Sequence, residues 1–192
     1  MKTNRKADHP VLPVILHRWS PRAMTGEEIS HEDLMTLFDA ARWAPSSYNG
    51  QPWRFLYATR NSPHFKTFLD LLMEGNKMWC TKAAVLIVVI SRKTFEENGK
   101  TERTHTYDTG AAWQNLALQG SSMGLVVHGM EGFDYVKAKK VLKIPDEFQV
   151  EAMAAVGKLA PKESLPPELQ KREAPSSRKP IAEIAMEGHF RS

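Results

Sequence analysis

The residues with the clearest chemical potential stand in one short stretch, WAPSSYNGQPWRF, at positions 43–55. Its two amides, Asn49 and Gln51, each carry a hydrogen-bond donor and an acceptor, and Pro45 and Pro52 stiffen the backbone on either side of them. Alternating amides suit the edge of a flat, pyrimidine-like ring on which donors and acceptors also alternate. The stretch therefore indicates either a loop that holds such a ring or an ordinary turn, in which prolines and glycine set the geometry and serines bond to nearby backbone.

The charge balance of the chain is mildly basic. Its 192 residues include 26 Lys and Arg against 22 Asp and Glu, which gives a formal net charge of +4 and a pI of about 9.2. The basic residues lie mostly in the two tails and in mixed-charge stretches, whereas a nucleic-acid groove needs a contiguous basic face. We therefore expect no nucleic-acid partner, and the bias suits a ligand that bears a phosphate.

Several other classes of site lack their signatures in this sequence. The seven histidines are scattered and, with the single Cys80, form no recognisable metal set. There is no G-x-G-x-x-G fingerprint, no P-loop and no obvious catalytic triad or carboxylate pair. The longest apolar run, at 83–90, is far too short to span a bilayer, and one cysteine fits a reducing compartment. We expect a cytoplasmic protein without a membrane partner or a bound metal.

Hydrophobic periodicity and helix caps predict the elements that must position the opening stretch. The predicted helices cover residues 10–18, 30–43, 62–72, 107–123 and 134–144. The predicted strands lie between Pro52 and Asn61 and over 83–91, 125–128 and 150–157. Strands and helices alternate, which is typical of an α/β or α+β arrangement with helices on the sheet, and residues 43–55 form a helix-to-strand connection.

The length and the composition predict a single domain over residues 1–192 with less regular ends. Residues 1–9 are polar and are expected to be flexible. After Gly157 the sequence is rich in Pro and charge and nearly lacks aromatic residues. Residues 160–192 are thus either a disordered tail or an extended arm that becomes ordered against another surface.

The opening stretch closely resembles the APSSxNxQPW segment of the nitroreductase family of flavin enzymes. Four further segments resemble elements of that family in the same order: RWSPR at 18–22, NKMWCTKAAVLIVV at 76–89, the long segment from DTGAAWQ to EGFD at 108–134, and SSRKPIAEI at 176–184. The resemblance covers about residues 14 to 184. It implies an α+β fold of three layers, with a central, mostly antiparallel sheet flanked by helices and a carboxy-terminal arm that wraps the partner subunit of a homodimer.

The resemblance also implies a non-covalently bound FMN and assigns residues to it. Arg18 and Ser20, with Trp19 between them, correspond to residues for the FMN phosphate, and Arg22 to a residue beside the flavin ring. Without the other motifs, solvated helix ends would explain both arginines. The family's carboxy-terminal phosphate arginine corresponds to Arg178, which Lys179 follows. Guanidinium groups pair bidentately with phosphate, which agrees with these roles.

Around the flavin ring, the resemblance assigns residues from three segments. The opening stretch supplies its residues largely from the partner subunit, and these are Pro45, Ser46, Ser47, Asn49 and Gln51. The turn at 128–134 supplies Met130, Glu131 and Gly132 near flavin N5, where the alternative is an ordinary strand-to-helix turn. Asn76 corresponds to a family Asn near the pyrimidine or ribityl region, and a helix-end cap is the alternative. Met78, Trp79 and Phe133 either line the acceptor side or pack in the core.

The activity implied by the resemblance is that of an FMN-dependent NAD(P)H oxidoreductase. NADH or NADPH would pass hydride to flavin N5, and a small conjugated acceptor such as a nitroaromatic or a quinone would then be reduced in the same pocket. The cofactor performs this chemistry, so no catalytic side chain is expected. Two alternatives are a flavin-binding module without nicotinamide-driven turnover and a basic nucleic-acid-binding protein that carries no flavin.

Overall fold

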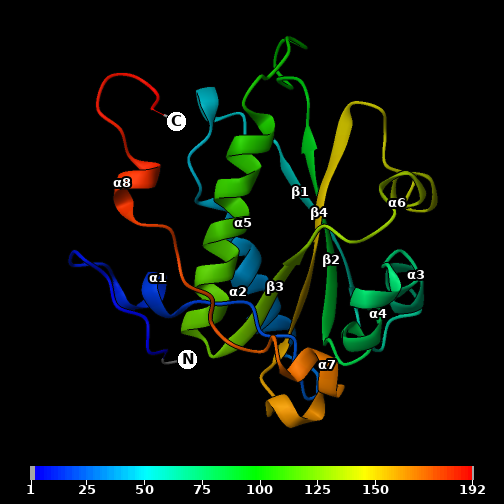
Figure 1. The fold of residues 1–192 in the computed structure, drawn as a ribbon. Helices are drawn as coiled ribbons and strands as arrows, with labels where there is room; N and C mark the ends of the chain where they lie inside the picture. Colours follow the sequence, from blue (N-terminus) through cyan, green and yellow to red (C-terminus); the bar gives the residue numbers. More distant parts are fainter. Residues whose placement is uncertain (1–2, 192) are drawn as a thin grey trace.

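The computed structural model describes residues 3–191, so Met1, Lys2 and Ser192, which belong to the two predicted terminal segments, lie outside the described part. One antiparallel sheet of four strands in the order β1-β2-β4-β3 forms the middle of the molecule (Figure 1). The strands are β1 (Trp53–Thr59), β2 (Val85–Arg92), β3 (Leu125–Met130) and β4 (Phe148–Lys158). All four occur where the sequence predicts a strand.

Helices cover both faces of this sheet. One face carries α2 (His31–Arg42) and α5 (His105–Ser122), and the other carries α3 (Phe65–Leu69), α4 (Glu74–Cys80) and α6 (Tyr135–Val141). The remaining helices are short and lie towards the two ends of the chain or in loops: α1 (Pro13–His17), the 3₁₀ turns η1 (Ser47–Asn49) and η2 (Lys162–Ser164), α7 (Pro167–Gln170) and α8 (Ile181–Ile184). The three-layer α+β prediction is confirmed.

The apolar sequence of β2 explains why the sheet is covered on both faces. Successive side chains of a strand point to opposite faces, and here each face is buried in a different core. Val85, Ile87 and Val89 lie in the core under α2 and α5, whereas Leu86, Val88 and Ile90 lie in the core under α3, α4 and α6. An uninterrupted apolar strand is what a position between two helical layers requires.

The predicted helix caps are present in the structure. The Ser30 side chain accepts a hydrogen bond from the Asp33 backbone N–H at 2.9 Å, and the Asp134 side chain accepts one from the Lys137 backbone N–H at 2.8 Å. Each cap satisfies an otherwise free donor of a first helical turn. They fix the starts of α2 and α6.

Helix α4 has no counterpart among the predicted helices. Its segment EGNKMWC begins with Glu74, Gly75 and Asn76, and the latter two residue types have poor helix propensity. Burial of Trp79 and Cys80 in the core stabilises the helix instead. Tertiary packing of this kind is weakly encoded in the local sequence.

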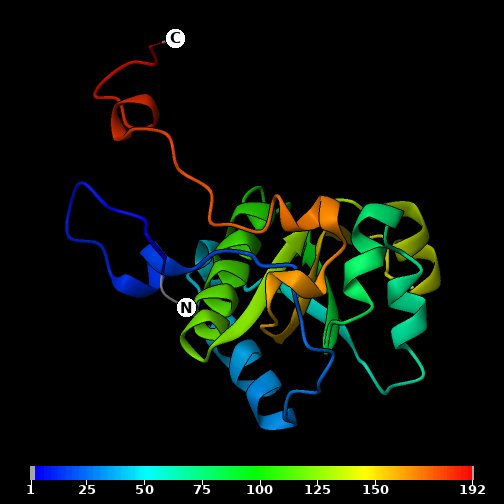
Figure 2. The same ribbon diagram turned by 60° about the horizontal axis from the view of Figure 1, so that its bottom comes forward.

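The predicted arm at residues 160–192 divides into two parts in the structure. Residues 160–173 remain on the body of the molecule, where the side chains of Ala160, Leu165 and Glu173 are buried. Every described residue from 174 to 191 is exposed. Figure 2 shows this last part projecting beyond α5 on the same side as the amino-terminal segment. We refer to residues 174–191 as the carboxy-terminal arm.

Gly120 permits the close packing of α5 on β3. A Cβ atom at Gly120 would lie 2.5 Å from Cγ2 of Val127, a buried and β-branched side chain with little room to move. We expect Gly120→Ala to lower the free energy of unfolding, because overpacking costs about 1–3 kcal/mol and the gain in helix propensity is only about 1 kcal/mol. Urea unfolding followed by circular dichroism measures the change.

Gly110→Ala in the same helix is the matched control. A Cβ atom there would meet nothing within 4 Å, so this substitution should keep or raise the stability by up to about 1 kcal/mol. Equal effects of the two substitutions would show that the contact between Gly120 and Val127 does not limit the packing of α5.

Candidate functional site

A cluster of three arginines lies where the two ends of the chain meet. Arg18 donates from Nη1 to the Ser20 hydroxyl at 3.2 Å. Arg5 donates from Nη1 to the Arg18 carbonyl at 2.8 Å and from Nε to the Ser176 carbonyl at 2.9 Å, while Arg178 binds the Ser176 hydroxyl at 2.9 Å. We call Arg5, Arg18 and Arg178 the basic cluster.

The basic cluster carries positive charge that the described residues do not balance. None of its three guanidinium groups forms an ion pair within residues 3–191. Burial lowers the pKa of Arg18, and the positive charges of Arg178 and Arg5 lower it further. Such a group of donors favours a multiply charged anion, and guanidinium is well matched to phosphate oxygens.

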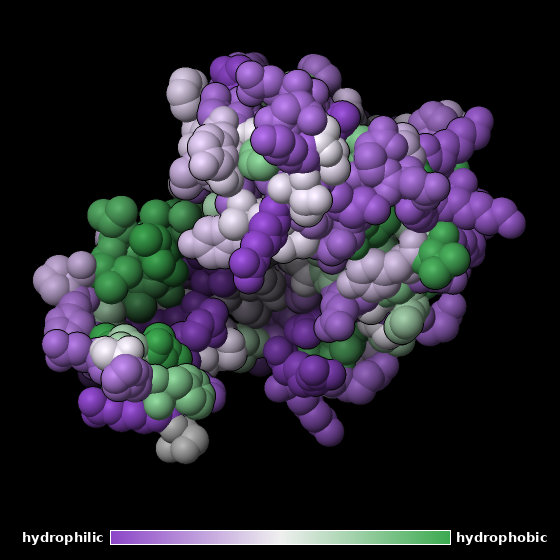
Figure 3. Space-filling model, turned by 90° about the horizontal axis from the view of Figure 1, so that it is seen from above, coloured by the Kyte–Doolittle hydropathy of each residue, from purple (hydrophilic) through white to green (hydrophobic). Residues whose placement is uncertain are grey.

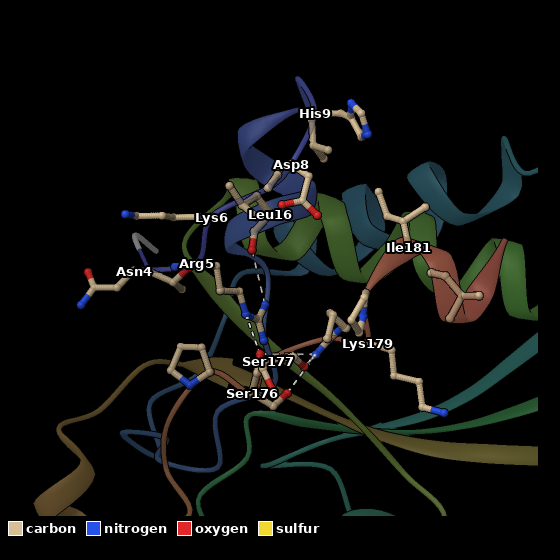
Figure 4. Close-up of a pocket in the computed structure, with 17 residues that line it drawn as sticks. Asn4, Arg5, Lys6, Asp8, His9, Leu16, Ser176, Ser177, Lys179 and Ile181 are labelled. Carbon is tan, nitrogen blue, oxygen red and sulfur yellow. Dashed lines mark hydrogen bonds between the residues drawn. The ribbon is translucent and has the colours of Figure 1, made fainter.

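The side chain of the predicted residue Lys179 points away from the basic cluster. Its Nζ lies 3.9 Å from the Glu183 carboxylate, and Figure 4 shows its side chain extending away from Ser176 and Ser177. The predicted residue Trp19 lies between Arg18 and Ser20 with a partly buried side chain. The structure thus brings Arg18, Ser20 and Arg178 together but leaves Lys179 at the side.

Arg22 is held by a buried carboxylate that the sequence did not single out. Glu173 accepts hydrogen bonds from the backbone N–H groups of Arg22 at 2.6 Å and Ala23 at 2.9 Å. The Arg22 guanidinium lies 3.6 Å from the other oxygen of Glu173, whose side chain is only 3% exposed. Glu173 therefore fixes both the backbone and the charge of Arg22, and it ties the base of the carboxy-terminal arm to the RWSPR segment.

His128 connects the same segment to the sheet. Its Nδ1 lies 2.8 Å from the Pro21 carbonyl, so Nδ1 carries the proton and donates. Its ring packs on Trp79 with the centroids 4.6 Å apart. Burial lowers the pKa of His128, opposed by the hydrogen bond to Pro21. This half-buried histidine therefore serves the structure, with its Nδ1 satisfied by a backbone carbonyl.

We expect Glu173→Ala to destabilise the fold. The substitution leaves one buried backbone donor, at Ala23, and one partly buried donor, at Arg22, without an acceptor, and an unsatisfied buried group costs about 1–3 kcal/mol. The urea midpoint measures the loss. Glu163→Ala, which removes an exposed carboxylate from the same region without such contacts, should leave the midpoint unchanged. A midpoint that does not move in Glu173→Ala would contradict the assigned role.

The predicted turn at 128–134 and Asn76 meet in the structure. The Asn76 amide donates to the Gly132 carbonyl at 3.1 Å, and the Met73 backbone N–H donates to the same carbonyl at 3.1 Å. Asn76 is therefore inside α4 and is not a helix-end cap. Met130 is buried, while Glu131 is exposed. The two hydrogen bonds to the Gly132 carbonyl tie the turn at the end of β3 to the start of α4.

The opening stretch adopts an unusual backbone conformation. Tyr48, Asn49 and Gln51 have left-handed φ angles of 49°, 56° and 47°, which cost about 1–3 kcal/mol each unless the surroundings enforce them. A hydrogen bond closes the loop, in which the Gln51 backbone N–H donates to the Ser46 hydroxyl at 3.0 Å. Asn49 and Gln51 are exposed. We call residues 45–51 the amide loop.

Two buried carboxylates that the sequence did not single out support the amide loop. Asp108 accepts a hydrogen bond from the Ser47 backbone N–H at 2.9 Å. Glu102, 1% exposed, lies so close that a Cβ atom at Gly50 would be 2.7 Å from its Oε1. Burial, followed by the charge of Asp108, raises the pKa of Glu102. A side chain at position 50 would force the Glu102 carboxylate to move, and the loop is held from below with its amides outward.

The basic cluster and the amide loop lie at opposite ends of α5. The loop contacts Asp108 in the first turn of α5. Strand β3 begins just after the other end of α5 with Leu125, which pairs with Lys158 of β4. Leu159 follows Lys158 and forms a β-bridge with Met24, which lies two residues after the RWSPR segment. Figure 1 shows α1, which directly precedes Arg18, near the lower end of α5. An 18-residue helix is about 27 Å long, so one chain alone does not bring the two groups together.

The residues proposed for the acceptor side divide between core and surface. Trp79 and Phe133 are buried in the core, so they serve packing, whereas Met78 is 45% exposed. A hollow of about 520 Å³ opens beside Met130 and Glu131, with Trp113 and Tyr135 among its walls. Within residues 3–191 no group of His, Cys, Asp and Glu is arranged to hold a metal ion, and no helix is long and apolar enough to cross a membrane.

Comparison with protein families gives one match. The sequence model of the nitroreductase family matches residues 15–78 and 59–158 of this chain. Together these segments contain the RWSPR segment, the amide loop, Asn76 and the turn at 128–134, and they exclude Arg5 and Arg178.

Individual relatives agree with this match. A crystal structure described as an oxidoreductase containing FMN is 46% identical, with a TM-score of 0.95 over 100% of this chain and 98% of that one. A protein of Desulfovibrio desulfuricans, solved in complex with FMN, is 27% identical, with a TM-score of 0.73 over 96% of this chain and 100% of that one. The major NAD(P)H-flavin oxidoreductase of Aliivibrio fischeri is 26% identical, and the match covers 48% of this chain and 52% of that protein.

Proposed function

This chain belongs to the nitroreductase family, and on that premise we propose that it is an FMN-dependent oxidoreductase. It takes reducing equivalents from NADH or NADPH and passes them to a small conjugated acceptor, such as a nitroaromatic or a quinone. The names of its relatives support the cofactor and the donor, since they include an FMN-containing oxidoreductase and an NAD(P)H-flavin oxidoreductase.

The observation that carries this proposal is the basic cluster beside Ser20. Arg18 and Arg178 converge there without carboxylate partners among residues 3–191, and a phosphate monoester supplies the missing negative charge. Guanidinium groups and a hydroxyl are the donors that phosphate oxygens accept. The residues present therefore fit the phosphate end of FMN.

The remaining polar groups fit the ring end of the same cofactor. When bound, FMN supplies hydride transfer between a nicotinamide and an acceptor at ring atom N5. Arg22, held by Glu173, would place a positive charge beside the pyrimidine edge of the ring. The backbone at Glu131 and Gly132, fixed by Asn76, would offer N–H donors near N5. No side chain of this chain needs to act as a nucleophile.

We propose that the amide loop completes the site from a second copy of the chain. One chain holds its amide loop and its basic cluster at opposite ends of α5, and only a partner can set Asn49 and Gln51 against the ring bound by the other. Exposed apolar side chains support this homodimer. Figure 3 shows apolar groups gathered on the projecting terminal segments, where Leu12, Ile184 and Phe190 are 66%, 68% and 87% exposed. Such a surface favours a protein partner.

The visible absorption spectrum of the purified protein, followed by anaerobic addition of NADH and then NADPH, tests the proposed function. We expect flavin bands that bleach with at least one donor and return on addition of a quinone. Bands that persist with both donors would favour a flavin-binding module without turnover. A protein that shows no bands even after addition of FMN would contradict the proposal.

A further inference from the structure

Arg5 joins the two segments that contain the predicted phosphate residues. It lies in the amino-terminal segment, outside the region matched by the family model, and no sequence motif marks it. Its guanidinium donates at 2.8 Å to the carbonyl of Arg18 and at 2.9 Å to that of Ser176, two residues before Arg178. Figure 4 shows the side chain of Arg5 reaching towards Ser176 and Ser177. One side chain thus joins two separate parts of the chain through hydrogen bonds.

This arrangement gathers like charges at short range. Burial lowers the pKa of Arg5 and of Arg18, and the charge of Arg178 lowers both pKa values further, as does the charge of Arg5 for Arg18. Arg5 satisfies part of its hydrogen-bonding capacity with carbonyl oxygens, but these oxygens do not neutralise its charge. The three cations repel one another, so the cluster is stable only when the repulsion is offset by an anion or screened by solvent ions.

The two terminal segments also enclose a space beside this cluster. A hollow of about 1010 Å³ is lined by residues 3–9 and 175–181 together with Val11, Leu16 and Ile184. Asp8 is the one acidic residue among the residues that line this hollow, whereas the lining includes Arg5 and Arg178 of the basic cluster, and the side chains of Lys6 and Lys179 extend away from the cluster (Figure 4). The surface between the segments is therefore predominantly basic, as binding of an anion requires.

We propose that Arg5 is a third phosphate-binding arginine, which holds the Arg18 and Arg178 segments together around the phosphate group of the flavin. The proposal rests on the proposed function, since it concerns the same cofactor. It adds the amino-terminal segment to the site. It also predicts that the phosphate, rather than the ring, stabilises the contact between the two ends of the chain.

Arg5→Ala and Lys6→Ala make a matched pair that tests this role. Both remove one positive charge from the same segment, but the structure gives the Lys6 side chain no hydrogen bond or ion pair among residues 3–191, and Figure 4 shows it extending away from Arg5. Each full-length variant is stripped of flavin and titrated with FMN and with riboflavin, which lacks the phosphate. Quenching of flavin fluorescence gives the dissociation constants.

We expect Arg5→Ala to bind FMN at least about tenfold more weakly than the wild type, as loss of a charged hydrogen-bonding group implies. Riboflavin affinity should be the same in both proteins, and Lys6→Ala should bind both flavins as the wild type does. The difference between Arg5→Ala and the wild type should shrink at high ionic strength. Limited proteolysis should show the amino-terminal segment protected by FMN, but not by riboflavin, in the wild type and in Lys6→Ala, and no such protection in Arg5→Ala.

Three results would overturn the role of Arg5. The first is unchanged FMN affinity in Arg5→Ala, and the second is an equal loss of FMN and riboflavin affinity, which indicates damage to the ring site. The third is an equal effect of Lys6→Ala, which indicates general electrostatic attraction. A wild-type protein that binds neither flavin would instead refute the proposed function, and the role of Arg5 with it, so the two failures are distinguishable.

Discussion

Replacement of both Arg18 and Arg178 with alanine should release FMN from the protein. Each arginine contributes a charged hydrogen bond worth about 1.5–3 kcal/mol, so the double substitution should weaken FMN binding by about 10²- to 10⁴-fold. Both side chains are at least partly exposed and make few contacts with the core, so the fold should remain intact. Fluorescence titration with FMN measures the affinity, and the visible absorbance of the protein peak in gel filtration shows whether the purified variant carries flavin.

A second double variant controls for the loss of net charge. Lys162 and Lys171 are exposed, lie on the short turns before the carboxy-terminal arm and have no ion-pair partner among residues 3–191. Their joint replacement with alanine should leave FMN binding within the error of the measurement. Full retention of FMN by Arg18→Ala/Arg178→Ala would show that the basic cluster is not the phosphate site.

The fold follows from the sequence wherever burial and periodicity agree. The strand β2 is apolar at every position that two helical layers cover, and the Ser30 and Asp134 caps mark the starts of α2 and α6. Helix α4 is the exception, because its helical state depends on the burial of Trp79 and Cys80 beneath it. Local propensity does not contain that information.

The site follows from the sequence only where a motif is contiguous. The amide loop is one uninterrupted stretch whose residue types suit either a ring with alternating donors and acceptors or an ordinary turn, and the family resemblance of the stretch favours the ring. The contact between Asn76 and Gly132 joins residues 56 positions apart, and that between Glu173 and Arg22 joins residues 151 positions apart. Hydrogen bonds of such range depend on the topology of the sheet, so no local pattern identifies the partners.

The supporting carboxylates illustrate the same limit. Asp108 has one visible signal, its place in the first turn of a predicted long helix, where an acidic residue is favoured by the helix dipole. The sequence offers no reason to connect it with Ser47, which it binds at 2.9 Å. Glu102 lies in an irregular segment before α5 and carries no signal. Its burial against Gly50 becomes visible only when the amide loop has been placed.

Removal of residues 175–192 should weaken the homodimer and FMN binding together. This cut keeps Glu173 and the buried Leu165, whereas a cut after Leu159 would also remove core contacts and destabilise the fold. The described residues removed are all exposed, so the melting temperature of the isolated body should change little. Sedimentation velocity gives the oligomeric state, and fluorescence titration gives the FMN affinity of the same preparation.

Two point variants separate the two contributions of the carboxy-terminal arm. Arg178→Ala removes a phosphate ligand but keeps the apolar side chains, so it should reduce FMN affinity by about 10-fold or more and leave the dimer intact. Ile181→Ser with Ile184→Ser removes apolar groups that are 45% and 68% exposed among the described residues, so it should weaken the dimer, because exposed apolar groups of this kind favour a protein partner. FMN affinity should then fall only as the dimer dissociates, since the amide loop of the second copy is lost. A truncated protein that stays a yellow, stable dimer would refute a wrapping arm, and the site would then have to be complete without residues 175–192.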